Sequence, residues 1–141
     1  MTGTEYPEPL EVVKAVYASH EKRDTPGLVE LLHPEVEWHQ AESHPYSGGR
    51  PWRGPREVVQ HVANPINQDW EGFTTEVEEY IDAGDRVIVL GRYRGTHRRT
   101  GVALDAQVCT IYTVVNGLIV KWQQYTDTHQ ICCAVGMEGQ A

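Results

Sequence analysis

Asp127 is the residue of this sequence whose type and position best suit a general base. It directly follows the last predicted strand, and the aromatic residues Trp122 and Tyr125 closely precede it. A carboxylate removes a proton from carbon most readily when partly apolar surroundings raise its pKa. The two aromatic rings could provide such surroundings, so we predict a catalytic role for Asp127. The alternative is structural, because an aspartate at the end of a strand often caps the turn that follows.

His44 is the second candidate for proton transfer. It lies with Tyr46 in the glycine- and proline-rich segment 43–54, whose composition predicts a loop. An imidazole titrates close to neutral pH and can donate a proton, and a tyrosine hydroxyl can donate a hydrogen bond. We therefore predict that His44 donates a proton to a bound small molecule, or contacts it, and that Tyr46 contacts it as well.

The histidines and cysteines do not predict a metal site. His39, Glu42 and His44 come closest to a ligand cluster, but they lack the helical two-histidine spacing of a zinc protease. The cysteines are odd in number and offer neither zinc-ligand spacing nor a disulfide framework; they are Cys109, Cys132 and Cys133. We expect no metal, no cofactor, and a reduced, cytoplasmic protein.

The composition predicts one globular domain over residues 1–141, with a core at about residues 10–130 and a tail at 131–141. Hydrophobic residues make up 40% of the chain and charged residues 23%, which is an ordinary globular balance. The net charge of -8 argues against a nucleic-acid partner, because phosphate binding needs a basic surface. No apolar stretch approaches the roughly 20 residues that span a bilayer, so we expect no membrane association.

Helical patterns dominate the first half of the chain and strand patterns the second half. Three helices are predicted, at residues 9–23, directly after Asp24, and at 56–63, where Asn64-Pro65 should stop the last one. Strands are predicted at residues 36–40, 74–80, 86–97, 104–115 and 118–126. Helices followed by a long antiparallel sheet are typical of an α+β fold, and a curved sheet closed by helices encloses a natural ligand cavity.

The dipeptide Asn116-Gly117 predicts a tight hairpin turn, which sets the faces of the last two strands. Pairing from this turn places Trp122 opposite Ile111 and Gln124 opposite Cys109, on the more apolar face. Strict alternation then puts Asp127 on the other face unless a bulge intervenes. The predicted inward-facing ligand contacts are Trp38, Gln40, Gln107, Trp122 and Gln124. The open alternative is a network in which these buried amides satisfy one another.

Several segments, in their order and spacing, resemble the SnoaL-like and ketosteroid-isomerase-like proteins of the nuclear transport factor 2-like superfamily. These segments are residues 12–18, 27–38, 45–49, 52–55, 84–87, 116–122 and 125–127. The resemblance implies a cone-shaped, curved antiparallel sheet wrapped around N-terminal helices, with a ligand pocket inside the cone. It also implies a homodimer formed through the outer face of the sheet.

The resemblance also bears on individual residues. SnoaL-like cyclases carry a catalytic aspartate at the end of the last strand, which corresponds to Asp127 here. The general base, the oxyanion tyrosine and the second aspartate of ketosteroid isomerases would fall near Gln40, Val16 and Cys109. All three positions depart from that pattern, so a steroid Δ-isomerase is not implied. Tyr17 lies one position from the place of the tyrosine, and we include it among the predicted ligand contacts.

Together these observations predict a protein that binds a small molecule in an internal pocket. The first hypothesis is a cofactor-independent acid–base enzyme of the cyclase, isomerase or hydratase type. Its substrate would be a medium-sized, largely apolar metabolite with a carbonyl or epoxide group. The alternatives are a non-catalytic binding protein with the same pocket, and an adaptor that acts through the exposed face of the sheet.

Overall fold

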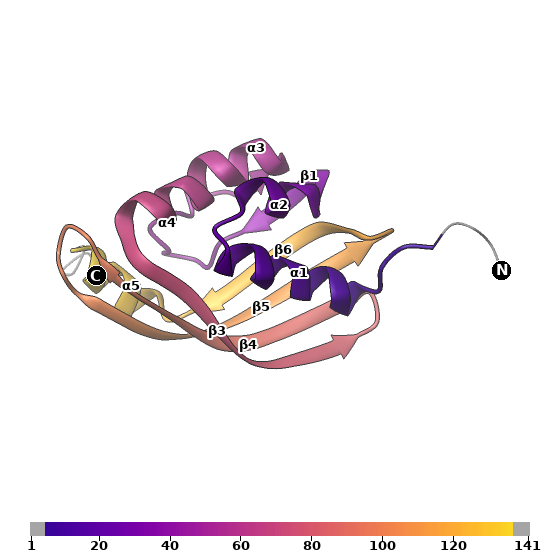
Figure 1. Cartoon of the computed structure of the whole chain (residues 1–141). Coiled ribbons are helices and arrows are strands. Elements are labelled where there is room, and N and C mark those ends of the chain that lie inside the picture. Colours follow the sequence, from indigo (N-terminus) through magenta and orange to yellow (C-terminus); the bar gives the residue numbers. More distant parts are fainter. Residues whose placement is uncertain (1–4, 137–141) are drawn as a thin grey trace.

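The computed structural model describes residues 5–136, which form one curved sheet with helices packed on its concave face (Figure 1). The helical elements are α1 (Pro9–Glu21), α2 (Thr25–Glu30), α3 (Gly54–Val58), η1 (Val59–Ala63), α4 (Asn64–Asp69) and α5 (Thr128–Val135). The strands are β1 (Leu32–His39), β2 (Trp52–Arg53), β3 (Trp70–Ala83), β4 (Arg86–His97), β5 (Ala103–Val115) and β6 (Leu118–Thr126). Their order in the sheet is β2-β1-β6-β5-β4-β3, and the sheet does not close into a barrel. The predicted α+β fold, with a curved sheet around N-terminal helices, is confirmed.

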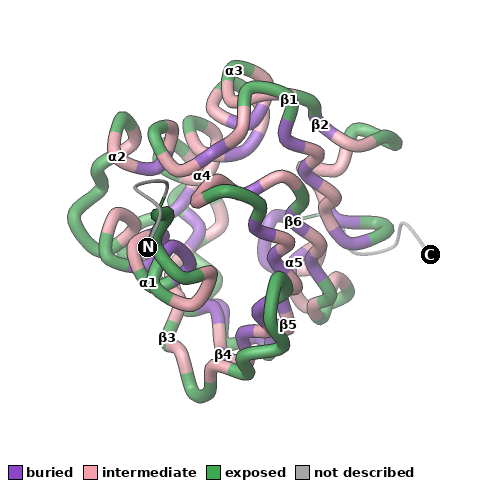
Figure 2. Tube along the Cα trace, turned by 90° about the vertical axis from the view of Figure 1, so that its right-hand side faces the viewer, coloured by how far each residue is buried: buried purple, intermediate pink, exposed green. Residues whose placement is uncertain are grey.

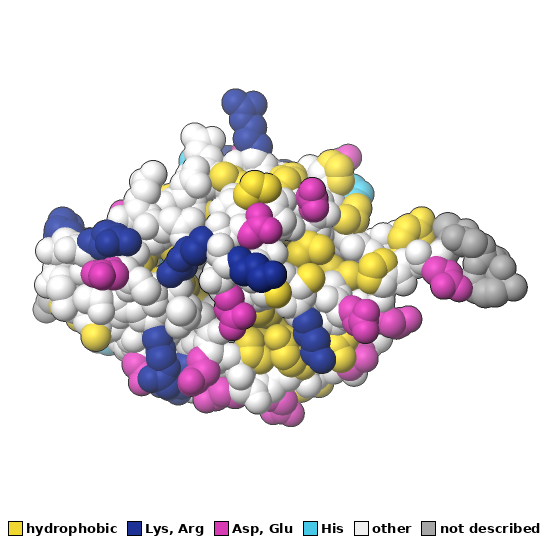
Figure 3. Space-filling model, viewed as in Figure 1, with side chains coloured by type: hydrophobic (Ala, Val, Ile, Leu, Met, Phe, Trp, Pro, Cys, Tyr) yellow, Lys and Arg dark blue, Asp and Glu magenta, His cyan; other side chains and the backbone are white. Residues whose placement is uncertain are grey.

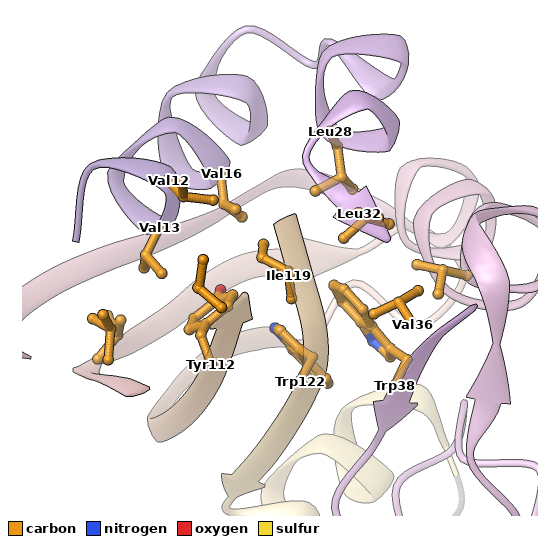
Figure 4. Packing of buried hydrophobic residues seen from close by; sticks show 14 of the residues in the cluster. Val12, Val13, Val16, Leu28, Leu32, Val36, Trp38, Tyr112, Ile119 and Trp122 are labelled. Carbon is orange, nitrogen blue, oxygen red and sulfur yellow. The ribbon is translucent and has the colours of Figure 1, made fainter. Parts of the chain in front are cut away.

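The first two helices form as their sequence patterns predict. Val12, Val13 and Val16 are fully or almost fully buried and give α1 one apolar face toward the sheet. Asp24 caps α2, where its Oδ1 accepts a hydrogen bond from the backbone N–H of Gly27 at 2.9 Å. Figure 4 shows the valines of α1 and Leu28 of α2 pointing at Ile119 and the aromatic rings of the sheet.

The prediction that the third helix stops at Asn64-Pro65 is wrong. The helix passes through Pro65 and ends at Asp69, because α3, η1 and α4 follow one another without a break. Pro65 has no N–H and cannot donate to the preceding turn of an α-helix. The turn just before it, η1, is π-helical, and this wider turn accommodates the missing donor without ending the helix.

The hairpin turn at Asn116-Gly117 forms as predicted, but the pairing predicted for the two strands beyond it is wrong. Both turn residues have positive φ, 53° and 78°, as a type I′ turn requires. A bulge then shifts the ladder, since Val114 pairs with Ile119 whereas Thr113 pairs with Lys121. Val120 is therefore an extra residue in β6, and every later pair moves by one position.

The bulge corrects the predicted pairing of the last two strands. Trp122 lies opposite Tyr112 and Gln124 opposite Thr110, and all four side chains are buried on the concave face. Along β5, buried positions alternate with exposed or half-buried ones, so its remaining residues lie on the outer face. Figure 2 shows the chain coloured by this burial. Gln107 is one of these exposed residues, and its predicted place in the pocket is wrong.

The sheet contains one parallel pair that the sequence did not predict. β1 runs parallel to β6, with Trp38 beside Trp122 in the register. β1 also starts at Leu32, four residues before the predicted strand, and it includes Pro34. The ladder between β1 and β6 is interrupted between Leu32 and Glu37, so the missing N–H of Pro34 breaks no regular pairing.

The predicted tail begins inside a helix. α5 covers residues 128–135, and its buried residues Ile131, Ala134 and Val135 pack with Trp70, Leu104 and Ala106. The β4–β5 loop satisfies the last carbonyls of α5, because Arg99 donates to Val135 and the Thr100 hydroxyl donates to Ala134. The rest of the predicted tail, residues 137–141, lies outside the described residues.

The surface of the described residues mixes charges of both signs. On the face shown in Figure 3, basic side chains are scattered singly among acidic and apolar ones. Within residues 5–136, no helix is long and apolar enough to cross a membrane.

Candidate functional site

A cavity of about 110 Å³ lies between the concave face of the sheet and the helices. Seven of the nine predicted site residues line it; they are Tyr17, Trp38, Gln40, His44, Tyr46, Trp122 and Gln124. Other lining residues were not predicted from the sequence, among them His20, Arg23, Trp70, Tyr93, Tyr112 and Ile131. Aromatic and aliphatic side chains form the larger part of the wall and polar side chains form the rest. A mainly apolar wall with placed polar groups is the usual composition of a small-molecule site.

His44 lines the cavity, and its hydrogen bonds decide which nitrogen of its ring carries the proton. Its Nδ1 accepts the backbone N–H of Tyr46 at 3.0 Å, and the Gln40 Nε2 lies 3.3 Å from the same atom. Both contacts require a lone pair on Nδ1, so the proton of the neutral ring must be on Nε2. Among residues 5–136, no side chain or backbone group forms a hydrogen bond with His44 Nε2. Burial lowers the pKa of His44 to about 4, so this donor is uncharged at neutral pH.

The loop that carries His44 is held by two tryptophans and a glycine. Trp52 Nε1 donates to the carbonyl of Tyr46 at 2.9 Å, and its ring stacks on His61 of η1 at 3.9 Å. Gly48 has a φ of 63° and lies so close to Trp52 that a Cβ would come within 2.4 Å of the indole. Only glycine fits this position. Trp38 Nε1 donates to Gln40 Oε1 at 2.9 Å and thereby orients the amide beside His44.

Gln124 is buried and satisfied by the protein itself. Its Oε1 accepts the backbone N–H of Ala41 at 3.1 Å, and its Nε2 donates to the hydroxyl of Tyr93 at 2.8 Å. These bonds join β6, the start of the His44 loop and β4. Gln124 therefore fixes the wall of the cavity, as the alternative of a satisfied amide network anticipated.

Tyr46 forms a second polar group in the cavity together with a carboxylate behind it. Its hydroxyl donates to Asp69 Oδ2 at 2.7 Å and accepts a hydrogen bond from Trp70 Nε1 at 3.2 Å. Burial, followed by the hydrogen bond to Asp69, raises the pKa of Tyr46. The phenol is therefore protonated at neutral pH, with its proton directed at Asp69. This contact could not be predicted from the sequence, because Asp69 lies beyond the point at which the third helix was predicted to end.

Tyr17 also takes part in a hydrogen bond between side chains. The Tyr112 hydroxyl donates to the Tyr17 hydroxyl at 2.8 Å, and burial raises the pKa of both phenols. The predicted register had turned Tyr112 outward, which is why this pair could not be found from the sequence.

The structure does not bring Asp127 into the cavity. Asp127 is exposed and caps α5, where its Oδ1 accepts the backbone N–H of Gln130 at 3.1 Å. Strand alternation predicted that Asp127 lies on the face opposite Trp122 and Gln124, which agrees with its position here. Its role as a cap agrees with the alternative to a catalytic role. α5 in turn supplies Ile131 to the cavity, and the thiol of Cys132 donates to the carbonyl of Ser43. Asp127 is thus the cap of the helix that carries Ile131 to the cavity wall.

No metal site appears in the part of the chain that the structure describes, residues 5–136. No group of three or more histidine, cysteine, aspartate or glutamate side chains is arranged there to hold an ion. His39 Nε2 lies 3.1 Å from the carboxylate of Glu37, and the same carboxylate forms an ion pair with Arg53. His44 uses its Nδ1 inside the loop.

The fold agrees with comparisons to known proteins. The chain matches the SnoaL-like domain family over residues 13–122 and therefore belongs to this family. A crystal structure of a nuclear transport factor 2-like protein from Burkholderia thailandensis is 32% identical, with a TM-score of 0.86 over 92% of this chain and 98% of that chain. No curated protein sequence matches this chain.

Two other solved structures are similar in fold. TerC, crystallised with polyporic acid, is 26% identical, with a TM-score of 0.80 over 90% of this chain and 97% of that one. A putative SnoaL-like polyketide cyclase from Jannaschia is 17% identical, with a TM-score of 0.78 over 90% of each chain, a likeness of fold alone.

The buried, neutral His44 makes stability depend on pH. In the unfolded chain a histidine has a pKa near 6.5, whereas the folded pKa of His44 is about 4. The unfolded state therefore binds the proton first, so this contribution to stability is full above pH 6.5 and is lost as the pH falls toward 4. At pH 4 the loss amounts to about 3 kcal/mol for this one group. Denaturant unfolding at pH 7 and pH 4 should show a smaller loss for His44→Gln than for the wild type.

The control for this prediction is His129→Gln, which changes an exposed histidine of α5. It should lose as much stability as the wild type between the two pH values. An equal loss in His44→Gln and the wild type would contradict the neutral, buried state of His44.

Proposed function

We propose that this protein binds a compact, largely apolar small molecule inside the cone and holds one oxygen atom of it through His44. The observation that carries the proposal is the neutral Nε2–H donor in a cavity whose wall is mostly aromatic and aliphatic. A carbonyl oxygen is the simplest acceptor for such a donor. A hydrogen bond in an apolar cavity is strengthened by the low local dielectric, and an unmet donor there is costly.

The wall beside this donor favours a flat carbon frame. Trp38 and Trp122 stack on each other with ring centroids 4.0 Å apart and planes 9° from parallel. Both rings are more than nine-tenths buried, and their packing leaves them little freedom to move. TerC, a relative in fold with 26% identity, was crystallised with polyporic acid, which supports a small-molecule ligand for a cavity of this kind.

Acid–base turnover of the bound molecule is the second candidate function. The observation in its favour is the 2.7 Å hydrogen bond from the Tyr46 hydroxyl to Asp69. In this scheme a C–H bond next to the ligand carbonyl breaks and its proton moves to the Tyr46 oxygen, while the Tyr46 proton moves to Asp69. The electron pair passes to the carbonyl oxygen, which His44 Nε2–H stabilises. Here Tyr46 and Asp69 take the role that the sequence suggested for Asp127.

The binding proposal is tested with indanone and indane, which share a flat carbon frame and differ in one carbonyl oxygen. Quenching of the fluorescence of the cavity tryptophans should show that the wild type binds indanone about tenfold more tightly than indane. This is the ratio expected from one good hydrogen bond. His44→Phe should bind indane as before and lose the preference for indanone. Asp127→Asn is the matched control, because asparagine caps a helix as well as aspartate does, and it should keep the preference.

Equal binding of the two ligands by the wild type, or an unchanged preference in His44→Phe, would contradict the role of His44. The same complexes in D₂O test turnover by proton NMR. The protons next to the indanone carbonyl should exchange faster than in buffer, and Tyr46→Phe should slow this exchange at least tenfold. Exchange at the rate measured in buffer would contradict turnover and leave ligand binding as the function.

We also propose that two copies of the chain associate through the outer face of the sheet. Half-buried apolar side chains are grouped there on β4 and β5, and Tyr125 of β6 is 56% exposed. These apolar side chains are Ile88, Leu90, Cys109 and Ile111. Ion pairs of Arg92 and Arg94 with Asp105 border this area, which gives an apolar centre with a charged rim.

Sedimentation should therefore show a dimer for the wild type and a monomer for Ile111→Lys. Lysine at this position would place a charge at the centre of the interface, where desolvation makes it costly. The control is Val102→Lys in the β4–β5 loop, at a residue that is 43% exposed, and it should stay dimeric. A monomeric wild type would overturn this proposal and leave the ligand site unaffected.

A further inference from the structure

Arg23 lies where the cavity opens to solvent. The exposed residues of the cavity lining are Arg23, Asp24, Asn67 and Thr74, so the opening lies between the end of α1, the helix α4 and the start of β3. The Arg23 Nη1 donates to the carbonyl of Phe73 at 3.0 Å and thus links α1 to β3 at this opening.

The backbone of Arg23 adopts an uncommon conformation that produces this link. Arg23 follows the last residues of α1 with a φ of 55°, and its N–H donates to the carbonyl of His20 at 3.1 Å. A left-handed conformation at a residue other than glycine costs free energy, so it persists only where the surroundings impose it. The conformation ends α1 and, together with the bond to Phe73, keeps the guanidinium at the opening.

Arg23 is also the only permanent cation among the described residues that line the cavity. Burial lowers the pKa of both His20 and His44 to about 4, so neither ring is charged at neutral pH. None of the ion pairs among residues 5–136 includes Arg23. A guanidinium carries five N–H donors, and the bond to Phe73 uses one of them.

The nearest acidic residue in the lining is Asp24, and its carboxylate is engaged elsewhere. Its Oδ1 accepts the N–H of Gly27 at the start of α2, and its Oδ2 lies so close that a Cβ on Gly27 would come within 2.4 Å. Asp24 is thus held against α2 as its cap. The remaining donors of Arg23 have no carboxylate partner among the described residues.

We propose that Arg23 binds the carboxylate of the ligand, so that the ligand is a compact apolar acid that also carries a carbonyl oxygen. The proposal deepens the proposed function and rests on it. The apolar body lies in the cavity, the oxygen accepts from His44, and the carboxylate stays at the opening, where water still reaches it. A guanidinium matches a carboxylate with two parallel hydrogen bonds.

The overall charge of the protein makes a local cation necessary for such a ligand. The chain has a net charge of -8, which repels an anion at long range. An exposed arginine that only linked α1 to β3 would have no influence on the choice between an acid and its neutral ester. The two roles of Arg23 are therefore separable by experiment.

The probes are 3-benzoylpropanoate and its methyl ester, which share the ring, the ketone and a flexible chain and differ in charge. At pH 7, quenching of the cavity tryptophans should show the wild type binding the acid at least tenfold more tightly than the ester. Arg23→Gln should weaken binding of the acid at least tenfold and leave the ester unchanged. Glutamine and arginine are equally disfavoured by the positive φ at this position, so the substitution does not change the cost of this conformation. Unchanged binding of the ester would show that the cavity is intact.

The matched control is Lys22→Gln, which removes the same charge one residue earlier, outside the cavity lining. It should leave binding of both probes unchanged. The role of Arg23 is overturned if the wild type binds the acid no better than the ester. It is also overturned if Arg23→Gln and Lys22→Gln weaken binding of the acid equally. If the ester and indanone bind in those cases, the proposed function stands; if neither binds, both proposals fail.

Discussion

The parallel pairing of β1 with β6 is the constraint on which the cavity depends. It joins two strands that are more than 80 residues apart in the chain and sets Trp38 beside Trp122. The two indoles stack in this register and close one side of the cone. Directly after β1, the backbone N–H of Ala41 is bound by the side chain of Gln124 on β6. The loop that carries His44 therefore starts from a fixed point on the sheet.

This fixed point decides the chemistry of the site. The loop turns His44 inward and uses the backbone N–H of Tyr46 to occupy one nitrogen of the ring. Burial then disfavours the charged form, and none of the ion pairs among residues 5–136 includes His44. The result is a neutral donor with a defined tautomer in an apolar cavity, a group that can hold an oxygen atom and stabilise negative charge that develops on it.

Much of the sheet could be predicted from the sequence, because strand alternation and turn conformation depend on residues that are close together in the chain. The bounds of β4 and β6 follow from alternation, and the turn at Asn116-Gly117 follows from the positive φ that both residues tolerate. The bulge at Val120 has no such local signal, since it is stabilised by the packing of Ile119 and Trp122 on the same face. One extra residue was enough to reverse the predicted faces of β5, and with them the places of Gln107 and Tyr112.

The candidate site shows the same division. Trp38, Gln40 and His44 were predicted correctly as cavity residues because strand parity and loop composition are local properties. The contact of Tyr46 with Asp69 and the position of Arg23 depend on how distant segments pack, which one sequence does not report. α5 did have a signal, since Asp127 and Gln130 stand three residues apart at its start and Gly136 follows its end. Interpretation of Asp127 as a catalytic base obscured its role as a helix cap.

The measurement that tests this account most directly is ¹⁵N NMR of the His44 ring in the wild-type protein, assigned with His44→Gln. At pH 7 the account predicts a neutral imidazole with its proton on Nε2, and a change in the Nε2 signal when indanone is added. A charged ring at pH 7, or a neutral ring with the proton on Nδ1, would contradict it, because the cavity would then lack the donor on which the proposed binding rests.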